Sequence, residues 1–171
     1  MQETVVDKLY EDNKSLLKFL EENSEISFQQ DMDNKLKKIL IVCSASYFEK
    51  EITDLLKKYF ILKTGENNEI VSFLSNKAIN RQYHTYFDWN GNNINKFLGL
   101  FGEKFKQQSL EEIQKKELTP AIKAFLTLGE LRNQLVHNNM ATHYIEQTNE
   151  EVYDLYKQAL RLILYFQTKF C

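Results

Sequence analysis

Helix-breaking residues are scarce in this chain, which contains one proline and five glycines in 171 residues. Because proline and glycine most often end helices and form turns, their scarcity favours long helices joined by short connections. Apolar residues recur every three or four positions along the chain, and no segment alternates convincingly with a period of two. We therefore predict an all-α bundle of about five to seven helices that forms one domain over residues 1–171.

The apolar spacing also sets the expected helix boundaries. A first helix is expected within residues 1–25, and a long second helix from Met32 to Ile61. The second helix would be about 45 Å long at about 1.5 Å per residue, which favours a bend near Ser44–Ser46. Turns are expected at residues 63–68 and 88–93. Further helices are predicted at Ile70–Ile79 and at Ile94–Phe105. Capping boxes predict two more, one after Ser109 and Glu112 and one after Thr148 and Glu151. A helix from Ala121 to Val136 is predicted because Thr119 can be its N-cap and Pro120 its first residue.

Charge and cysteine content indicate the compartment and the kind of partner. The net charge is −2, so any contact with nucleic acid has to come from a local basic patch, such as one completed by a second subunit. Cys43 and Cys171 are typical of reduced thiols rather than of a disulfide framework. No signal-peptide pattern follows Met1, and the longest apolar runs are too short to cross a bilayer. We expect a cytoplasmic protein without a membrane segment.

The most informative motif is the segment Arg132–His137, at the end of a predicted helix. Asn133 and His137 lie four residues apart and therefore share one face of the helix. Arg132 is turned by about 100° from Asn133, but its long side chain can reach the same site. The following Asn138–Asn139 pair can leave the helix through the left-handed conformation that asparagine tolerates.

These side chains suit the cleavage of RNA. His137 would take the proton of a 2′-hydroxyl or donate one to the leaving oxygen, and Arg132 would hold the phosphate. The 2′-hydroxyl as an internal nucleophile would restrict such a site to RNA. A second interpretation stays open, because a histidine in a last helical turn interacts favourably with the helix dipole and asparagine often ends helices. Spacing alone favours this second interpretation.

Other parts of the chain carry a resemblance to a known family. The Arg-Asn-x-x-x-His motif on a late helix is accompanied by stretches at Ser46–Leu56, Tyr83–Trp89, Asn95–Phe97 and Phe101–Gly102. With these stretches the chain resembles the HEPN superfamily, and more closely the RiboL-PSP-type HEPN nucleases of prokaryotic defence and toxin–antitoxin systems. The resemblance covers residues 35–170 and is weakest for the N-terminal helix.

The resemblance implies a metal-independent endoribonuclease that needs no cofactor. In the family, motifs from two subunits face each other across a homodimer and build one composite cleft. Carried over to this chain, Arg132 and His137 would be catalytic, with Asn133 as the polar residue that follows the arginine. Glu49 would match an acidic residue of an earlier helix that supports the site, and Asn138 is a second supporting candidate.

The resemblance also implies partners. An antitoxin or another protein of a defence system could accompany the enzyme, and RNA would be its substrate. In family toxins that are silenced by adenylylation, a tyrosine stands two residues after the motif histidine. Asn139 occupies that position here, so we do not expect this mode of regulation.

The residues around Glu49 allow two placements of its side chain. Glu49 shares a helix face with Ala45, Ile52 and Leu56, so we expect it to point inward and to need a polar partner. A partly exposed surface carboxylate is the alternative, since glutamate is seldom fully buried.

Two aspartates raise the question of a metal site. Asp31 and Asp33 could bind a divalent cation, but they precede the second predicted helix, where acidic residues interact favourably with the helix dipole. No further carboxylate pair at ligand spacing joins them. We therefore predict no metal.

The segment before Trp89 offers candidate contacts to RNA. Arg81 could grip the RNA backbone and Tyr83 could stack on a base, although core packing is the safer interpretation of the tyrosine. His84 is a third candidate, for which a local hydrogen bond or surface pair with Asp88 is the alternative.

We interpret the chain as an endoribonuclease of a defence, stress-response or toxin–antitoxin system. Two other functions stay open. The first is a non-catalytic HEPN-like module that binds RNA or assembles proteins. The second is a helical partner-binding protein in which the motif only ends a helix.

Overall fold

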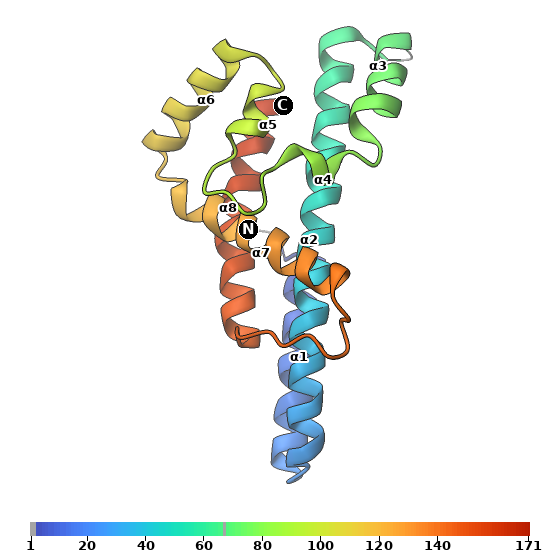
Figure 1. The fold of residues 1–171 in the computed structure, drawn as a ribbon, viewed down its shortest axis with the longest axis vertical. Helices are drawn as coiled ribbons and strands as arrows, with labels where there is room; N and C mark the ends of the chain where they lie inside the picture. Colours follow the sequence, from blue (N-terminus) through green and yellow to red (C-terminus); the bar gives the residue numbers. More distant parts are fainter. Residues whose placement is uncertain (1–2, 67) are drawn as a thin grey trace.

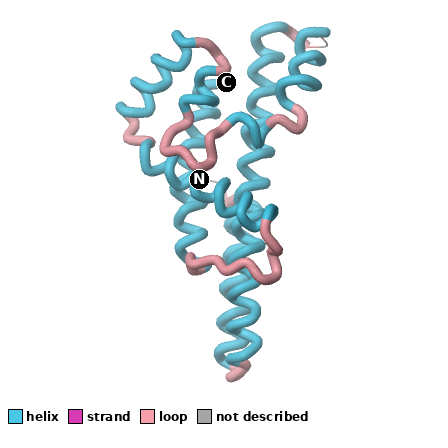
Figure 2. The backbone as a smooth tube through the Cα atoms, in the orientation of Figure 1, coloured by secondary structure: helices cyan, strands magenta, loops and turns pink. Residues whose placement is uncertain are grey.

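The computed structural model describes residues 3–66 and 68–171, so that Met1, Gln2 and Asn67 lie outside the described residues. The described residues form eight α-helices and one short π-helical segment, and none of them lies in a β-strand (Figure 2). The predicted all-α class is confirmed. The number of helices is slightly above the five to seven expected.

Most helices follow one another with short connections, but residues 87–94 and 138–148 form longer ones. In chain order the helices are α1 (Val5–Glu22), α2 (Ile26–Thr64), α3 (Glu69–Leu74), the π-helical segment η1 (Ser75–Ile79), α4 (Tyr83–Tyr86), α5 (Asn95–Gly99), α6 (Glu103–Lys115), α7 (Thr119–His137) and α8 (Asn149–Phe170).

The long helix α2 organises the fold (Figure 1). It contains neither glycine nor proline, runs without interruption through Ser44–Ser46, and ends at Gly65, whose φ of 90° is a conformation that glycine tolerates well. Helix α1 packs beside the first half of α2, and the two project together as a hairpin. Helices α7 and α8 pack against each other and against α2. The α2–α7 contact brings residues from the middle of α2 next to the motif.

Aromatic side chains pack at the centre of the core, among a larger number of aliphatic residues. Phe48 of α2, Phe125 of α7 and Tyr156 of α8 are almost completely buried, and Phe48 lies with its ring centroid 5.7 Å from that of Phe125 and 5.4 Å from that of Tyr156. Each such ring removes about 150–250 Å² from water. These contacts hold α2, α7 and α8 in fixed relative positions and so support the site described below.

Two predicted helices in the middle of the chain are wrong in their boundaries. The expected helix Ile94–Phe105 is interrupted, since α5 ends at Gly99 and α6 starts after Gly102, which has a φ of 89°. The expected capping box at Ser109 does not exist either. Ser109 is buried inside α6, where its hydroxyl donates to the carbonyl oxygen of Phe105 at 2.7 Å.

Other helix ends agree with the sequence more closely. The capping box of Thr148 and Glu151 is confirmed at the start of α8. At the start of α7, however, Leu118 and not Thr119 is the N-cap, and it makes no side-chain capping bond, although Pro120 lies in the first turn as predicted. The segment predicted as Ile70–Ile79 is helical, but its second half is the π-helical segment η1.

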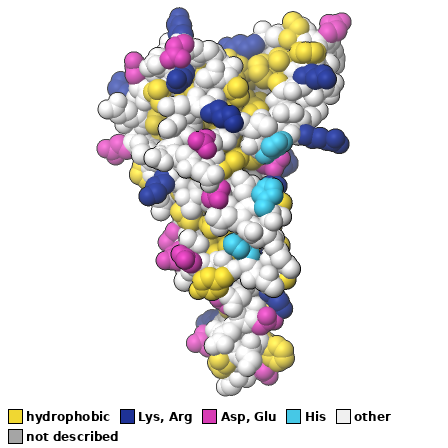
Figure 3. All heavy atoms as spheres, in the orientation of Figure 1, with side chains coloured by type: hydrophobic (Ala, Val, Ile, Leu, Met, Phe, Trp, Pro, Cys, Tyr) yellow, Lys and Arg dark blue, Asp and Glu magenta, His cyan; other side chains and the backbone are white. Residues whose placement is uncertain are grey.

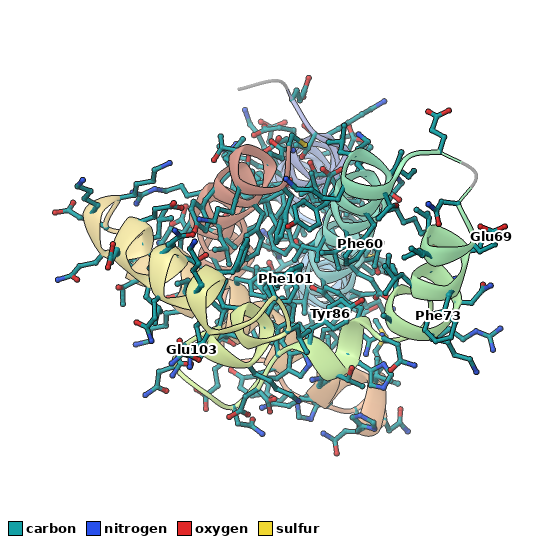
Figure 4. The ribbon with its side chains drawn as sticks, turned by 90° about the horizontal axis from the view of Figure 1, so that it is seen from above. Phe60, Glu69, Phe73, Tyr86, Phe101 and Glu103 are labelled. Atoms are coloured by element: carbon teal, nitrogen blue, oxygen red, sulfur yellow. The ribbon has the colours of Figure 1, made fainter. Side chains whose placement is uncertain are left out.

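An apolar groove of about 550 Å³ lies at the end of the bundle away from the α1–α2 hairpin. In the view from above, Phe60, Tyr86 and Phe101 lie toward the centre of this end, between α3 on one side and α6 on the other (Figure 4). Phe60, Tyr86 and Phe101 line the groove, and none of the motif residues does. The groove is therefore separate from the candidate site.

Candidate active site

The motif occupies the last turns of α7, and the buried face of that helix holds it in place. Phe125, Leu128 and Leu135 are at most 2% exposed. Arg132 lies between these positions and is half-buried, whereas His137 ends the helix and is exposed. The helix period thus anchors one face in the core and leaves the motif at its edge.

Asparagines end α7 directly after the histidine. The backbone N–H of Asn138 donates to the carbonyl oxygen of Gln134, and its side-chain Nδ2 donates to the same oxygen at 2.9 Å. Asn138 has a φ of −102° and a ψ of 168°. The predicted left-handed exit is therefore wrong. The side-chain bond to the carbonyl satisfies the helix end, so an extended residue is sufficient here.

The loop after α7 is attached to α2. The Nζ atom of Lys38 donates to the carbonyl oxygens of Met140 and Ala141 at 2.8 and 3.3 Å. The backbone N–H of His143 donates to the carbonyl oxygen of Asn139 at 2.8 Å. These bonds restrict the chain that follows His137 to one path across α2.

A pocket of about 150 Å³ lies beside the motif, between α2, α4 and α7. It brings together groups that are far apart in the sequence. Its lining consists of Ala45, Phe48, Glu49, Tyr83, His84, Trp89, Phe125, Gly129, Arg132 and Asn133. The predicted residues Glu49, Arg132 and Asn133 therefore share one cavity, together with two of the three predicted RNA contacts.

The polar groups of the pocket have complementary charges. Glu49 is half-buried and lines the pocket, and its carboxylate forms no ion pair or hydrogen bond with the described residues, so the polar partner expected for an inward side chain is absent among them. Arg132 donates from Nη1 to Oδ1 of Asn133 at 3.3 Å. A carboxylate and a guanidinium that line the same small cavity leave both signs of charge available to a ligand.

Tyr83 contributes a hydroxyl to the same cavity. Its side chain is 8% exposed, and its hydroxyl makes no hydrogen bond with the described residues. Burial raises the pKa of Tyr83 well above its ordinary value, the Glu49 carboxylate raises it further, and Arg132 lowers it. The phenol therefore keeps its proton and can act as a donor.

Trp89 forms one wall of the pocket. Its indole Nε1 donates to the carbonyl oxygen of His84 at 3.0 Å, which fixes the orientation of the ring. The ring approaches α7 so closely that a Cβ atom at Gly129 would lie 2.1 Å from Trp89 Cε3. Only glycine at this helix position leaves room for the indole.

His137 lies outside this cavity, one helical turn beyond Asn133. Its imidazole is exposed, and it therefore remains accessible to a substrate or to a second chain. The three histidines of the chain lie on the same face of the molecule (Figure 3). His84, which lines the pocket, and His137 are both exposed on that face.

Several predicted contacts do not join the site. Arg81 is exposed with a φ of 62° and does not line the pocket. The prediction that Asp31 and Asp33 precede a helix is wrong, because α2 already begins at Ile26. Asp33 accepts a hydrogen bond from Asn149, and Asp31 is bonded to a lysine of its own helix. Within residues 3–66 and 68–171, no group of three or more histidine, cysteine, aspartate and glutamate side chains is arranged to hold a metal ion.

The spacing of the motif gives no sign of Trp89, Phe48 or Phe125, which reach the pocket from three different segments. Gly129 does leave a signal in the sequence. A glycine inside a helix costs about 1 kcal/mol relative to alanine, so it commonly marks a close approach by another group.

Among the described residues, no helix is long and apolar enough to cross a membrane. The family model RiboL-PSP-HEPN matches residues 7–171, which include most of α1 and the whole of the pocket. Comparisons with curated proteins and with solved structures gave no significant match. HEPN domains are generally associated with RNase activity, and they commonly dimerise and bind RNA. The chain belongs to the RiboL-PSP-HEPN family.

Proposed function

We propose that the protein is an endoribonuclease that cleaves RNA through its 2′-hydroxyl and without a metal ion. The observation that carries this proposal is the meeting of Glu49, Arg132 and Asn133 in one pocket, with the exposed His137 one helical turn away. The reaction requires a group that binds the phosphate and a group that transfers protons, and the guanidinium of Arg132 and the imidazole of His137 are of these two kinds.

In the proposed reaction, Arg132 binds the non-bridging phosphate oxygens and stabilises the charge that develops on them. His137 takes the proton of the 2′-hydroxyl. The 2′-oxygen then forms a bond to phosphorus while the bond from phosphorus to the 5′-oxygen breaks. A second imidazole donates a proton to the departing 5′-oxygen. The products are a 2′,3′-cyclic phosphate and a 5′-hydroxyl.

The second imidazole would come from another copy of the chain. Large apolar side chains that neighbour the motif in sequence are exposed: Val136 is 56%, Met140 is 40% and Tyr144 is 73% exposed. Exposed apolar groups of this size are typical of interaction surfaces when they cluster. A two-fold symmetric contact at this surface would place two copies of His137 at one composite cleft.

Within this proposal Asn133 orients Arg132 through their hydrogen bond, Glu49 balances the charge of the guanidinium, and Asn138 fixes the helix end that carries His137. We also propose a single HEPN-like domain over residues 1–171 and a cytoplasmic location, which the two free cysteines support. A role in defence, in stress response or in a toxin–antitoxin system, with a possible antitoxin or defence partner, follows from the family resemblance.

A non-catalytic RNA-binding module is the second candidate. The observation that favours it is the position of His137, which does not line the pocket that contains Arg132. In that case the pocket would bind RNA and the imidazole would take no part in bond cleavage.

Alanine substitutions in the motif test the enzyme. We expect both His137→Ala and Arg132→Ala to reduce cleavage of a single-stranded RNA by at least about 10²-fold in the presence of EDTA, because each removes one chemical function. Cleavage is measured on labelled RNA, and the product ends are identified by mass spectrometry. His143→Ala and Arg161→Ala are matched controls, which change the same residue types outside the motif and should retain activity.

Unchanged cleavage by His137→Ala would refute the assigned acid–base role. Wild-type activity that disappears with EDTA would contradict a reaction without metal. Wild-type protein that binds RNA but leaves it intact would establish the second candidate instead.

A further inference from the structure

The pocket beside the motif contains hydrogen-bonding groups that its own residues do not satisfy. The Glu49 carboxylate and the Tyr83 hydroxyl both line it and form no hydrogen bond with the described residues. Tyr83 is more than nine-tenths buried. Neither the Glu49 carboxylate nor the Tyr83 hydroxyl is fully enclosed by protein, so both are open to the cavity and can bond to a ligand there.

The orientation of the Asn133 amide follows from its neighbour. Arg132 has only donors, so the atom of Asn133 that it contacts must be the carbonyl oxygen, as the Nη1 to Oδ1 distance of 3.3 Å indicates. The amide nitrogen Nδ2 is then left with its two donor hydrogens. The cavity therefore offers an acceptor pair on Glu49 and donors on Asn133 and Tyr83.

Much of the remaining lining is aromatic, beside Ala45, Gly129 and Arg132. Tyr83 and Trp89 lie with ring centroids 5.6 Å apart, and Trp89 and Phe125 lie 5.7 Å apart. These rings are tilted against one another and Phe125 is only 1% exposed, so Trp89 is the ring that stays open for stacking on an unpaired nucleobase. The volume of about 150 Å³ is well below the ~300 Å³ at which pockets for drug-sized ligands begin, so it suits one base rather than a whole nucleotide.

We propose that this pocket binds one unpaired guanine of the RNA substrate, with Glu49 accepting its N1–H and N2–H groups and Asn133 donating to its O6. The proposal rests on the proposed function, since Arg132 at the same cavity would hold the adjoining phosphate. Tyr83 adds a donor near O6, and Trp89 stacks on the ring.

The other bases satisfy these groups less well. Guanine alone presents two adjacent N–H groups beside a carbonyl oxygen, which is the complement of a carboxylate beside an amide nitrogen. Adenine and cytosine each have a ring nitrogen acceptor where guanine has N1–H. Uracil has one N–H between two oxygens, which would repel the second carboxylate oxygen of Glu49.

Tryptophan fluorescence can measure this binding without a label. Trp89 is its only tryptophan and lines the pocket, so intrinsic fluorescence reports on occupancy. The measurement uses the His137→Ala variant, which is not expected to cleave, with the four nucleoside 3′-monophosphates as ligands. We expect guanosine 3′-monophosphate to change the fluorescence with a dissociation constant at least about tenfold lower than that of the other three.

Two changes test the carboxylate itself. Inosine 3′-monophosphate lacks the N2 amino group, and we expect it to bind about tenfold more weakly than the guanosine compound. Glu49→Gln in the same background should weaken guanosine binding on the order of 10–100-fold, because one acceptor becomes a donor. Glu51→Gln is the matched control, since Glu51 lies on the same helix but bonds to Gln167 of α8 at 3.4 Å.

Equal binding of all four nucleotides, a preference for another base, or no binding at all would overturn the proposal. So would a guanosine preference that Glu49→Gln leaves intact. The comparison of guanosine with inosine needs no substitution in the pocket, so it tests recognition of the N2 amino group even if Glu49→Gln does not fold. Because binding is measured without cleavage, its failure is distinguishable from failure of the enzyme proposal.

Discussion

Gly129 decides how closely Trp89 can approach α7. A Cβ atom at position 129 would lie 2.1 and 2.2 Å from two indole carbons, and the indole is held in place by its bond to the His84 carbonyl. The ring cannot move aside without losing that bond or filling the pocket. The absence of a Cβ atom at position 129 therefore allows the indole to form this wall of the pocket.

We predict that Gly129→Ala destabilises the protein by about 1–3 kcal/mol, the usual cost of overpacking, although alanine favours helices. The measurement is chemical denaturation with Trp89 fluorescence as the probe. Gly99→Ala is the control, because Gly99 also lies in a helix but a Cβ atom there meets nothing within 4 Å. Equal stability of wild type and Gly129→Ala would show that the indole is not fixed as described.

At the residue scale, the sequence predicts the motif better than the pocket. Asn133 and His137 share a face because helical spacing is regular, and Glu49 lines the pocket from the helix face that it shares with Ala45. Trp89 and Phe125 could not be predicted in the same way. They meet through the packing of separate segments, and local spacing carries no information about such contacts.

Among the elements, α1 is attached to α8 by the stacking of Tyr10 on Tyr153 and by the carboxylate of Asp7. Asp7 accepts hydrogen bonds from the Tyr153 hydroxyl at 2.7 Å and from Lys157 at 3.0 Å, and it also accepts from the backbone N–H of Thr4 at 2.8 Å. Burial alone would raise the pKa of Asp7, but these bonds outweigh it and lower the pKa from 3.8 to about 2.

We predict that this network makes stability depend on acid pH. Because the pKa of Asp7 is lower in the folded chain, the carboxylate stabilises the fold above about pH 4, and this contribution is lost as the pH falls toward 2. The pKa difference corresponds to about 2 kcal/mol. Urea denaturation at several pH values should show Asp7→Asn less stable than wild type at pH 7, with the gap closing near pH 2.

Asp12→Asn is the matched control, because Asp12 is exposed on the same helix. It should leave the free energy of unfolding unchanged across this range. A constant difference between Asp7→Asn and wild type from pH 7 to pH 2 would contradict the role of the Asp7 charge.

The elements themselves differ in how well sequence predicts them. Helices α2, α7 and α8 are long enough to show several turns of apolar spacing, and their ends carry recognisable residues such as Gly65 and the Thr148 capping box. Helices α4 and α5 have only four and five residues, so their period is not detectable. The break at Gly102 was hidden because Phe101 and Phe105 continue a helical pattern across it.

At the scale of the whole molecule, the proposed reaction requires two chains. One chain supplies a pocket with Arg132 and one exposed His137, whereas the reaction needs one group to take a proton and another to return it. Val136, Met140 and Tyr144, which lie near His137 in sequence, each expose a large apolar side chain. Membership in a family whose domains commonly dimerise agrees with this requirement.

Mixed dimers test this claim most directly. One wild-type chain and one chain carrying His137→Ala are co-expressed with different affinity tags, and the dimer that contains both is purified. Its cleavage of single-stranded RNA is compared with that of the wild-type dimer. We predict that the mixed dimer loses at least about 10²-fold of the wild-type activity, because the proposed reaction needs both imidazoles of the shared cleft although one chain keeps a complete motif. A mixed dimer that retains half of the wild-type activity or more would contradict a site shared between two chains.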